Sequence, residues 1–270
     1  MAYEKYMEMK NAAIPADIAA DLGRCSAFAR ENTGKTGSGT RAENSAASAA
    51  PSAPITLTAF EDKNDVLKNP KLRREAGFAK MPDGNYIVSM FCPMPDVTAE
   101  MIDWWFWWHP QEKERYKLWF PGEHFNISVS KKDADYFSAE KFPGFKPNSQ
   151  FPTEKIGGIR MPLRIDFVNP GDFGFHETLM KKSRVKTVIC GHVGAFGGIV
   201  SHTEMSHIFF EDGDGLFMTS RFWIGKTLKN PLIRKIILTD ETAFGMAAHC
   251  CVEYRNLAAK LPELFAEYAK

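Results

Sequence analysis

His249 and Glu253 have the side-chain types and the spacing of a metal site. Both lie in Met246–Tyr254, a stretch near the C-terminus that is predicted to be helical. Residues four apart on a helix stack on one face, close enough to share one ion. The same spacing joins His207 and Glu211, but in a predicted strand, where four residues span about 13 Å and cannot chelate. Taken alone, the first pair is more often an exposed pair on a helix surface than a metal site.

A third candidate is His124, which is predicted to follow an aromatic strand beginning at Arg115. A single histidine is usually structural, so His124 needs partners before it counts as a metal ligand. Just before it, Trp104–Trp108 holds four tryptophans in five residues. We expect this helix to be buried on most sides or to lie at a subunit interface, with direct ligand stacking as the alternative.

The composition predicts a globular protein that binds a small, weakly charged molecule. The 270 residues are 44% hydrophobic, enough for one large domain or a main domain with a smaller appendage. Lys and Arg number 34 against 33 for Asp and Glu, so no overall field favours nucleic acid or an anionic membrane. The five cysteines form no Cys-x-x-Cys pair, and no signal-peptide core or membrane-length apolar run appears. We therefore expect a cytoplasmic protein with reduced cysteines.

The secondary-structure elements that must position these residues include both helices and strands. Residues 14–30 predict a short amphipathic helix and residues 31–54 a linker. Alternation and turn signals predict strands at Asn85–Phe91, Arg164–Val168, Val185–Cys190, Glu204–Phe210 and Leu216–Trp223. A helix is predicted from Thr98 to His109, and a long one from Asp240 to the C-terminus. This pattern favours an α+β fold in which an antiparallel sheet and the C-terminal helix enclose a ligand cavity.

In combination, several blocks resemble the family of 2,4-diacetylphloroglucinol and phloretin hydrolases. They are Asp103–His109, Arg115–Trp119 with Glu123-His124, Glu154–Gly158, Ser220–Gly225 and the pair His249 and Glu253. The blocks occur in the family's order between about residues 78 and 268, and their combination is much more specific than any one motif.

The resemblance implies a zinc ion held by His124, Glu154, His249 and Glu253. Glu123 and Glu140 compete with Glu154 for the third position. Two nitrogen and two oxygen ligands suit zinc and leave a coordination position for water or substrate.

Further site residues follow from the same resemblance. Tyr116, Asn126 and His207 are expected to act on the substrate, and Trp119 and Phe222 to line its pocket. Phe222 stands where we expect tyrosine in some relatives, so one hydroxyl contact would be missing.

The implied fold is a curved antiparallel sheet gripping a long C-terminal helix (helix-grip, START-like). Residues 79–270 would form the catalytic domain, and residues 1–78 a helical and linker region that is a candidate dimerisation element of a homodimer. The implied reaction is hydrolysis of the bond between an aryl ring and its ketone carbonyl, with phloretin favoured. The alternatives are 2,4-diacetylphloroglucinol, an ester or amide substrate for the same zinc site, or a carrier of aromatic ligands without catalysis.

Overall fold

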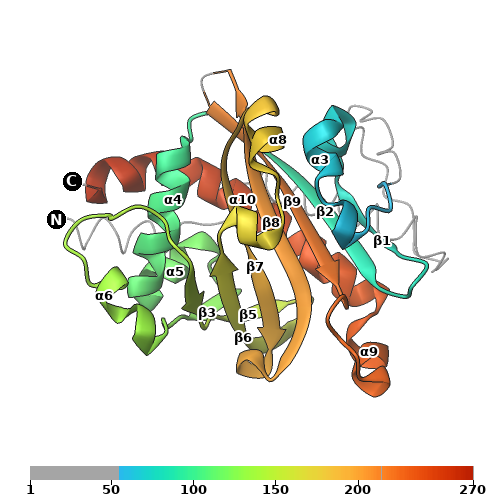
Figure 1. Ribbon diagram of the computed structural model, residues 1–270. Coiled ribbons are helices and arrows are strands. Elements are labelled where there is room, and N and C mark those ends of the chain that lie inside the picture. Colours follow the sequence, from blue (N-terminus) through green and yellow to red (C-terminus); the bar gives the residue numbers. More distant parts are fainter. Residues whose placement is uncertain (1–54, 214, 270) are drawn as a thin grey trace, which may run out of the picture.

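The computed structural model describes residues 55–213 and 215–269, which form one antiparallel sheet with helices on both faces (Figure 1). The nine strands of this described part follow the order β1-β2-β9-β8-β7-β6-β5-β3, with β4 paired to β6. They are β1 (Gly77–Lys80), β2 (Tyr86–Met94), β3 (His124–Asn126), β4 (Asn148–Gln150), β5 (Thr153–Ile156), β6 (Ile159–Val168), β7 (Val185–Ala195), β8 (Val200–Asp212) and β9 (Gly215–Ile224). The helices are α3 (Asp65–Lys68), α4 (Ala99–Trp108), α5 (Lys113–Trp119), α6 (Ala134–Phe137), α7 (Pro170–Phe173), α8 (Glu177–Lys182), α9 (Pro231–Ile237) and α10 (Asp240–Tyr268).

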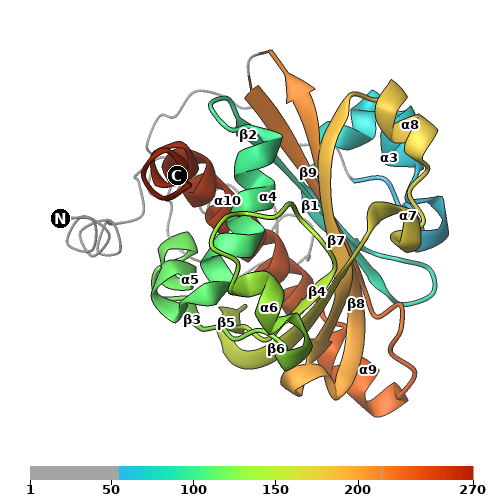
Figure 2. The same ribbon diagram turned by 60° about the vertical axis from the view of Figure 1, so that its left-hand side comes forward.

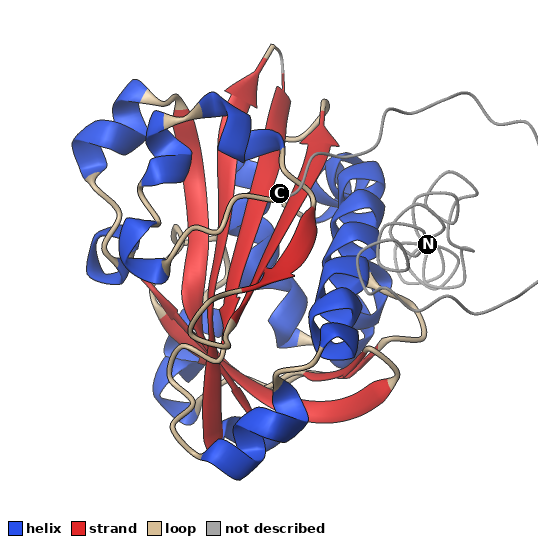
Figure 3. Cartoon of the chain, turned by 90° about the vertical axis from the view of Figure 1, so that its right-hand side faces the viewer, coloured by secondary structure: helices blue, strands red, loops and turns tan. Residues whose placement is uncertain are grey.

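The sheet separates two helical layers (Figure 2). α10, α4 and α5 lie on one face, and the shorter α3, α7 and α8 lie on the other. The 29-residue α10 packs on β2, β1 and β5, and its C-terminal part meets α4 (Figure 3). The α+β architecture with a long C-terminal helix is confirmed. None of the described helices has the length and apolar character needed to cross a bilayer.

The tryptophan-rich α4 is a core helix. Thr98 caps it by accepting a hydrogen bond from the backbone N–H of Met101, as the sequence predicts. All four tryptophans are at most 5% exposed. They are covered from two sides, because Trp104 meets Phe265 of α10 at 5.3 Å between ring centroids and Trp105 meets Trp119 of α5 at 5.9 Å. The expectation of burial on most sides is confirmed.

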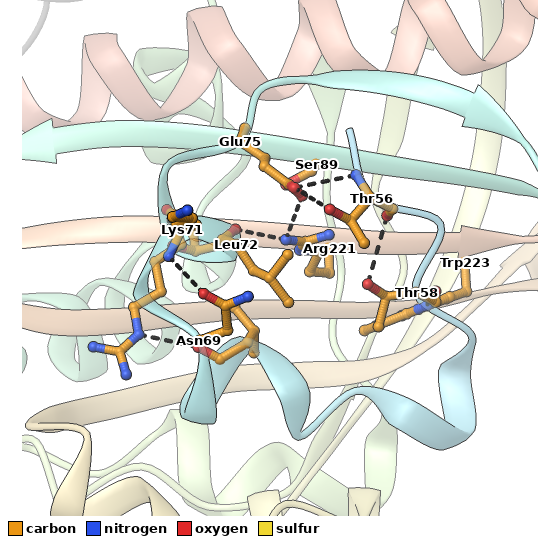
Figure 4. Close-up of polar contacts among 12 residues, drawn as sticks. Thr56, Thr58, Asn69, Lys71, Leu72, Glu75, Ser89, Arg221 and Trp223 are labelled. Atoms are coloured by element: carbon orange, nitrogen blue, oxygen red, sulfur yellow. Dashed lines mark hydrogen bonds and ion pairs between the residues drawn. The ribbon is translucent and has the colours of Figure 1, made fainter. Parts of the chain in front are cut away.

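The segment from Ile55 to Glu75 packs on the outer face of the sheet (Figure 4). There Arg221 of β9, 2% exposed, donates to the Leu72 carbonyl at 2.6 Å and pairs with Glu75 at 2.9 Å. Trp223 donates to the Thr58 carbonyl at 2.9 Å. This segment is therefore built into the sheet's packing, while the helix expected at residues 14–30 lies outside the described residues. The domain boundary at residue 78 stays a prediction.

Two local predictions are wrong. The expected strand at Arg115 is the helix α5, in which Arg115 pairs with Glu112 at 2.6 Å and Lys117 with Glu114 at 2.9 Å. These three-residue spacings suit a helix and outweigh the β preference of its aromatic residues. The strand expected at Asn85–Phe91 was placed too short, because β2 continues through Pro93 to Met94. β1 stops pairing at Ser89, so this part of β2 has a neighbour on one side only and tolerates proline.

Candidate metal centre and aromatic cavity

Three elements converge on the candidate metal centre. His124 begins β3 and is the direct cross-strand partner of Glu154 in β5. His249 and Glu253 lie one turn apart on α10 and are 6% and 8% exposed. The four side chains therefore meet where the β3–β5 edge of the sheet faces the long helix.

A contact between two glycines sets the distance between the sheet edge and the helix. Gly157, in the turn after β5, has φ +59°, which a glycine adopts without strain. Its Cα lies so close to Gly245 of α10 that a Cβ on Gly245 would stand 2.5 Å from it. The turn after Glu154 thus touches the helix one turn before His249. This contact gives a physical reason for the glycine that follows Glu154 in the sequence block.

The distances between ligand atoms match one small ion. Nε2 of His124 lies 3.1 Å from Nε2 of His249 and 3.5 Å from Oε2 of Glu253. Nε2 of His249 lies 3.8 Å from Oε2 of Glu253 and 3.7 Å from Oε2 of Glu154. A tetrahedron with metal–ligand bonds of roughly 2.0–2.2 Å has edges of about 3.3–3.6 Å. Three of these residues, His124, His249 and Glu253, have ligand atoms all within 4.8 Å of one another, whereas Glu154 is not part of this compact group and approaches it through His249.

The two histidine rings face each other at the candidate metal centre, with their Nε2 atoms 3.1 Å apart. His124 Nδ1 lies 3.3 Å from the Tyr116 carbonyl. A carbonyl can only accept, so His124 donates its N–H to the backbone and presents a lone pair at Nε2. This lone pair points toward the second ring and is available to a cation between them.

Burial keeps the histidines neutral and works against ionisation of the glutamates. It lowers the pKa of His249 to about 4 and that of His124 well below its ordinary value, with His249 adding to the effect on His124. Burial also raises the pKa of Glu154 to about 7, and burial with the neighbouring Glu154 raises that of Glu253 well above its ordinary range. The short His–Glu contacts are therefore not ion pairs. Two buried carboxylates beside two neutral imidazoles suit a divalent cation, whose charge would compensate both.

Tyr116 connects the metal centre to the cavity beside it. Its hydroxyl donates a hydrogen bond to Oε1 of Glu154, which orients that carboxylate. Its ring stacks on His124 at 4.2 Å with an interplanar angle of 11°. The contact between Tyr116 and Glu154 is not predictable from sequence spacing, because the two residues are 38 positions apart.

The cavity is mainly apolar and holds most of the expected substrate residues. Its walls include Tyr116, Trp119, His207 and Phe222 together with Glu154, His249 and Glu253 at one end. His207 points inward from β8, where Ser220 Oγ lies 2.7 Å from Nδ1, and burial lowers its pKa to about 3. Asn126 is exposed and does not line the cavity; the next residue, Ile127, does.

Sequence reasoning gave no role to two further polar residues of the cavity wall. His109 and Gln150 are 1% and 2% exposed and line the same cavity. His109 belongs to the aromatic block at residue 103, so its place in that block was the available signal. No comparable signal marks Gln150, which enters the cavity because β4 pairs with β6.

Two solved structures are distantly similar to this chain. A protein of Mycobacterium smegmatis, Ms6760, aligns with a TM-score of 0.36 at 13% identity, covering 66% of this chain and 94% of that one. The protein CV1439 of Chromobacterium violaceum aligns with a TM-score of 0.30 at 8% identity, covering 59% and 95%.

Sequence comparison is far more informative. The chain is 33% identical over 237 residues to the 2,4-diacetylphloroglucinol hydrolase of Pseudomonas protegens, covering 79% of this chain and 75% of that protein. It is 30% identical over 228 residues to the phloretin hydrolase of Eubacterium ramulus, covering 80% and 81%. The model of the DAPG hydrolase PhiG domain matches residues 57–266, which hold both the sheet and the four candidate ligands. This chain belongs to the DAPG hydrolase PhiG domain family.

Proposed function

We propose that this protein is a zinc-dependent hydrolase that cleaves the carbon–carbon bond between the aryl ring and the ketone carbonyl of an acylphloroglucinol. Phloretin is the substrate we favour, giving phloroglucinol and phloretic acid. The observation that carries the proposal is the meeting of His124, Glu154, His249 and Glu253 at the end of an aromatic cavity, in a member of this hydrolase family.

The donor set fits zinc. Two neutral imidazole nitrogens and two carboxylates are ligands that zinc accepts, and the lone pair at Nε2 of His124 faces the ring of His249. When bound, zinc supplies a Lewis acid that polarises a carbonyl or lowers the pKa of a water. A carrier of aromatic ligands would have no use for four converging His and Glu side chains, which cost free energy to bury.

The residues of the chain have separable roles in this reaction. Water adds its oxygen to the carbonyl carbon, the bond to the ring breaks, and the ring carbon takes a proton, so the products are a phenol and a carboxylic acid. Tyr116, next to Glu154, orients a ring hydroxyl, and the aromatic walls hold the ring and exclude bulk water. His207 is neutral, so the nitrogen that does not contact Ser220 can exchange a proton with the substrate.

Phe222 is the reason for favouring phloretin over 2,4-diacetylphloroglucinol. It lines the cavity, is 4% exposed, and meets His207 edge to face at 5.5 Å. A phenyl group here makes this part of the wall apolar, which suits a long arylpropanoyl group better than a second polar acetyl group.

The deciding experiment combines elemental analysis with a product assay. Purified protein should contain zinc and release phloroglucinol from phloretin, with 2,4-diacetylphloroglucinol tested in parallel. His124→Ala and His249→Ala should lose both metal and turnover, whereas His176→Ala, at an exposed histidine remote from the cavity, should keep both. Normal metal content and activity in both ligand variants would remove the proposed centre. Rapid cleavage of simple esters without any attack on the ketones would show a different reaction.

The proposal also includes the fold, the cellular compartment and the oligomeric state of the protein. We propose a helix-grip fold, supported by the packing of α10 along the sheet, in a cytoplasmic homodimer. The four cysteines of the described residues are buried free thiols, in keeping with a reducing compartment. Sedimentation measurements of the full chain test the dimer.

A further inference from the structure

The cavity wall holds two further polar side chains, His109 and Gln150. The ring of Tyr116 stacks on both histidines, 4.2 Å from the His124 ring and 5.6 Å from the His109 ring, with interplanar angles of 11° and 24°. The Tyr116 ring therefore connects His109 to the candidate metal centre. Gln150 donates to the Phe106 carbonyl at 3.1 Å, and the Phe106 ring meets His109 edge to face at 5.6 Å.

His109 presents only a hydrogen-bond acceptor to the cavity. Its Nδ1 lies 2.7 Å from the Trp105 carbonyl, which can only accept, so Nδ1 holds the proton and Nε2 carries a lone pair. Burial lowers the pKa of the ring to about 3, so it remains in this neutral form. Among the described residues, none hydrogen-bonds to Nε2.

A chain of hydrogen bonds fixes Gln150 in the same sense. Asn148 donates its amide to the Lys146 carbonyl at 2.9 Å, so its own oxygen is an acceptor. Gln150 donates to that oxygen and to the Phe106 carbonyl, both at 3.1 Å, which uses both of its amide protons. Oε1 of Gln150 is therefore the free group, and no donor to it occurs in the described part of the chain.

We propose that His109 and Gln150 form a subsite that binds a phenolic hydroxyl at the end of the substrate's acyl arm. The ligand hydroxyl would donate its proton to one of these two acceptors. Trp119, whose ring meets that of His109 at 5.3 Å, adds a buried indole N–H that has no hydrogen-bond partner among the described residues. This inference rests on the proposed function and narrows the substrate class to acylphloroglucinols with a hydroxyaryl arm.

The position of the subsite favours the acyl arm over the phloroglucinol ring. With the scissile carbonyl at the metal end, the ring hydroxyls beside it stay close to Tyr116 and Glu154. His109, whose ring stacks on that of Tyr116, is reached by a longer arm, whereas an acetyl group ends near the carbonyl. The subsite would therefore favour phloretin over 2,4-diacetylphloroglucinol, because an acetyl group cannot make this contact.

The test compares phloretin with the same ketone lacking only the terminal hydroxyl. For the zinc-loaded protein we expect kcat/KM to be roughly 10- to 100-fold higher for phloretin, the cost of leaving buried acceptors unpaired. In His109→Asn, the side-chain amide N–H can take the place of the Nδ1–H donor, but Nε2 is lost. The ratio of kcat/KM between the two ketones should therefore fall at least several-fold. His192→Asn, the matched change at a half-exposed histidine on the outer face, should leave the ratio unchanged.

Both ketones are measured on the same sample, so loss of folded protein cancels from the ratio. A wild-type ratio near one, or an unchanged ratio in His109→Asn, would overturn the subsite and leave the proposed reaction standing. Activity on 2,4-diacetylphloroglucinol alone would have the same consequence. No cleavage of any of these ketones by the zinc-loaded protein would overturn the proposed function and the subsite with it.

Discussion

Three buried ionisable groups and the largely buried Glu154 meet in one place and need a partner that the other side chains do not provide. Glu154 and Glu253 lose solvation and repel each other, and burial keeps both imidazoles neutral, with the N–H of His124 turned to the backbone. A protein without a function for this arrangement could fill the space with apolar residues at lower cost. The arrangement is therefore best understood as a site prepared for a cation.

Tyr116 is the residue whose substitution tests how a candidate metal ligand is held in place. Removing its hydroxyl in Tyr116→Phe leaves Glu154 without the donor that orients it. Such supporting contacts typically change metal affinity by about 10–100-fold, so we expect zinc affinity to fall in that range while the fold is kept. Competition with a chromophoric chelator measures the affinity. An unchanged zinc affinity would mean that this hydrogen bond does not hold the ligand.

The residues of the site differ in how far the sequence could predict them. His249 and Glu253 were visible because helical spacing places them on one face. The partnership of Glu154 with His124 depends on strand pairing across 30 residues, so it came from family resemblance and not from spacing. The role of Asn126 stays a prediction: this residue is exposed at the end of β3, after a register shift that follows His124, and Ile127 beyond the strand lines the cavity.

At the scale of elements, local pattern predicted most of the fold. β7, β8, β9 and α10 have strong alternation or helical periodicity, and all were expected. α5 was missed because its seven residues are rich in aromatics, and only its tertiary contacts and charge pairs favour the helix. The packing of Gly245 against Gly157 could not be foreseen, since it depends on how α10 meets the turn after β5.

Gly245→Ala tests whether this glycine contact sets the site. Helix propensity alone predicts that alanine stabilises α10 by about 1 kcal/mol. The new Cβ would stand 2.5 Å from Cα and 2.8 Å from N of Gly157, backbone atoms that cannot rotate away. We therefore expect a lower melting temperature and weaker zinc binding. Gly171→Ala, where a Cβ meets nothing within 4 Å, is the control and should change neither.

Asp103 joins α4 to the sheet and gives the protein a predictable pH dependence. It accepts a hydrogen bond from Thr187 of β7 at 2.6 Å, and burial raises its pKa from 3.8 to about 6. Between these two values the unfolded chain loses a proton that the folded protein keeps. The free energy of unfolding should therefore fall as pH rises through this window and stay lower above it.

Asp103→Asn removes that titration and keeps an oxygen for Thr187. The quantity to compare is the difference in free energy of unfolding between the variant and wild type. From low pH to above about pH 6, this difference should shift in favour of the variant by at most roughly 3 kcal/mol. Urea unfolding of both proteins across this pH window measures the gain. A stability difference that does not vary with pH would show that Asp103 has its ordinary pKa in the folded protein.

At the scale of the whole molecule, the metal centre links elements that otherwise have few ties. β5 and β3 end the order of strands, so β3 has a single described neighbour in the sheet. The opposite end, β1, is backed by α10. A metal bound by His124, Glu154 and the helical pair would therefore fasten the free end of the sheet to the C-terminal helix.

Removing zinc should consequently loosen this end and leave the centre of the sheet unchanged. With free zinc at roughly 1,000 times its dissociation constant, binding contributes about 4 kcal/mol, and each kcal/mol shifts the melting temperature by about 2–4 °C in a protein of this size. We expect a chelator to lower the melting temperature accordingly and zinc to restore it. Hydrogen exchange should accelerate at His124–Asn126 and Thr153–Ile156 but not in the centre of β8, which is paired on both sides. Equal acceleration in β8 would mean that the ion stabilises the molecule globally and does not fasten one edge to α10.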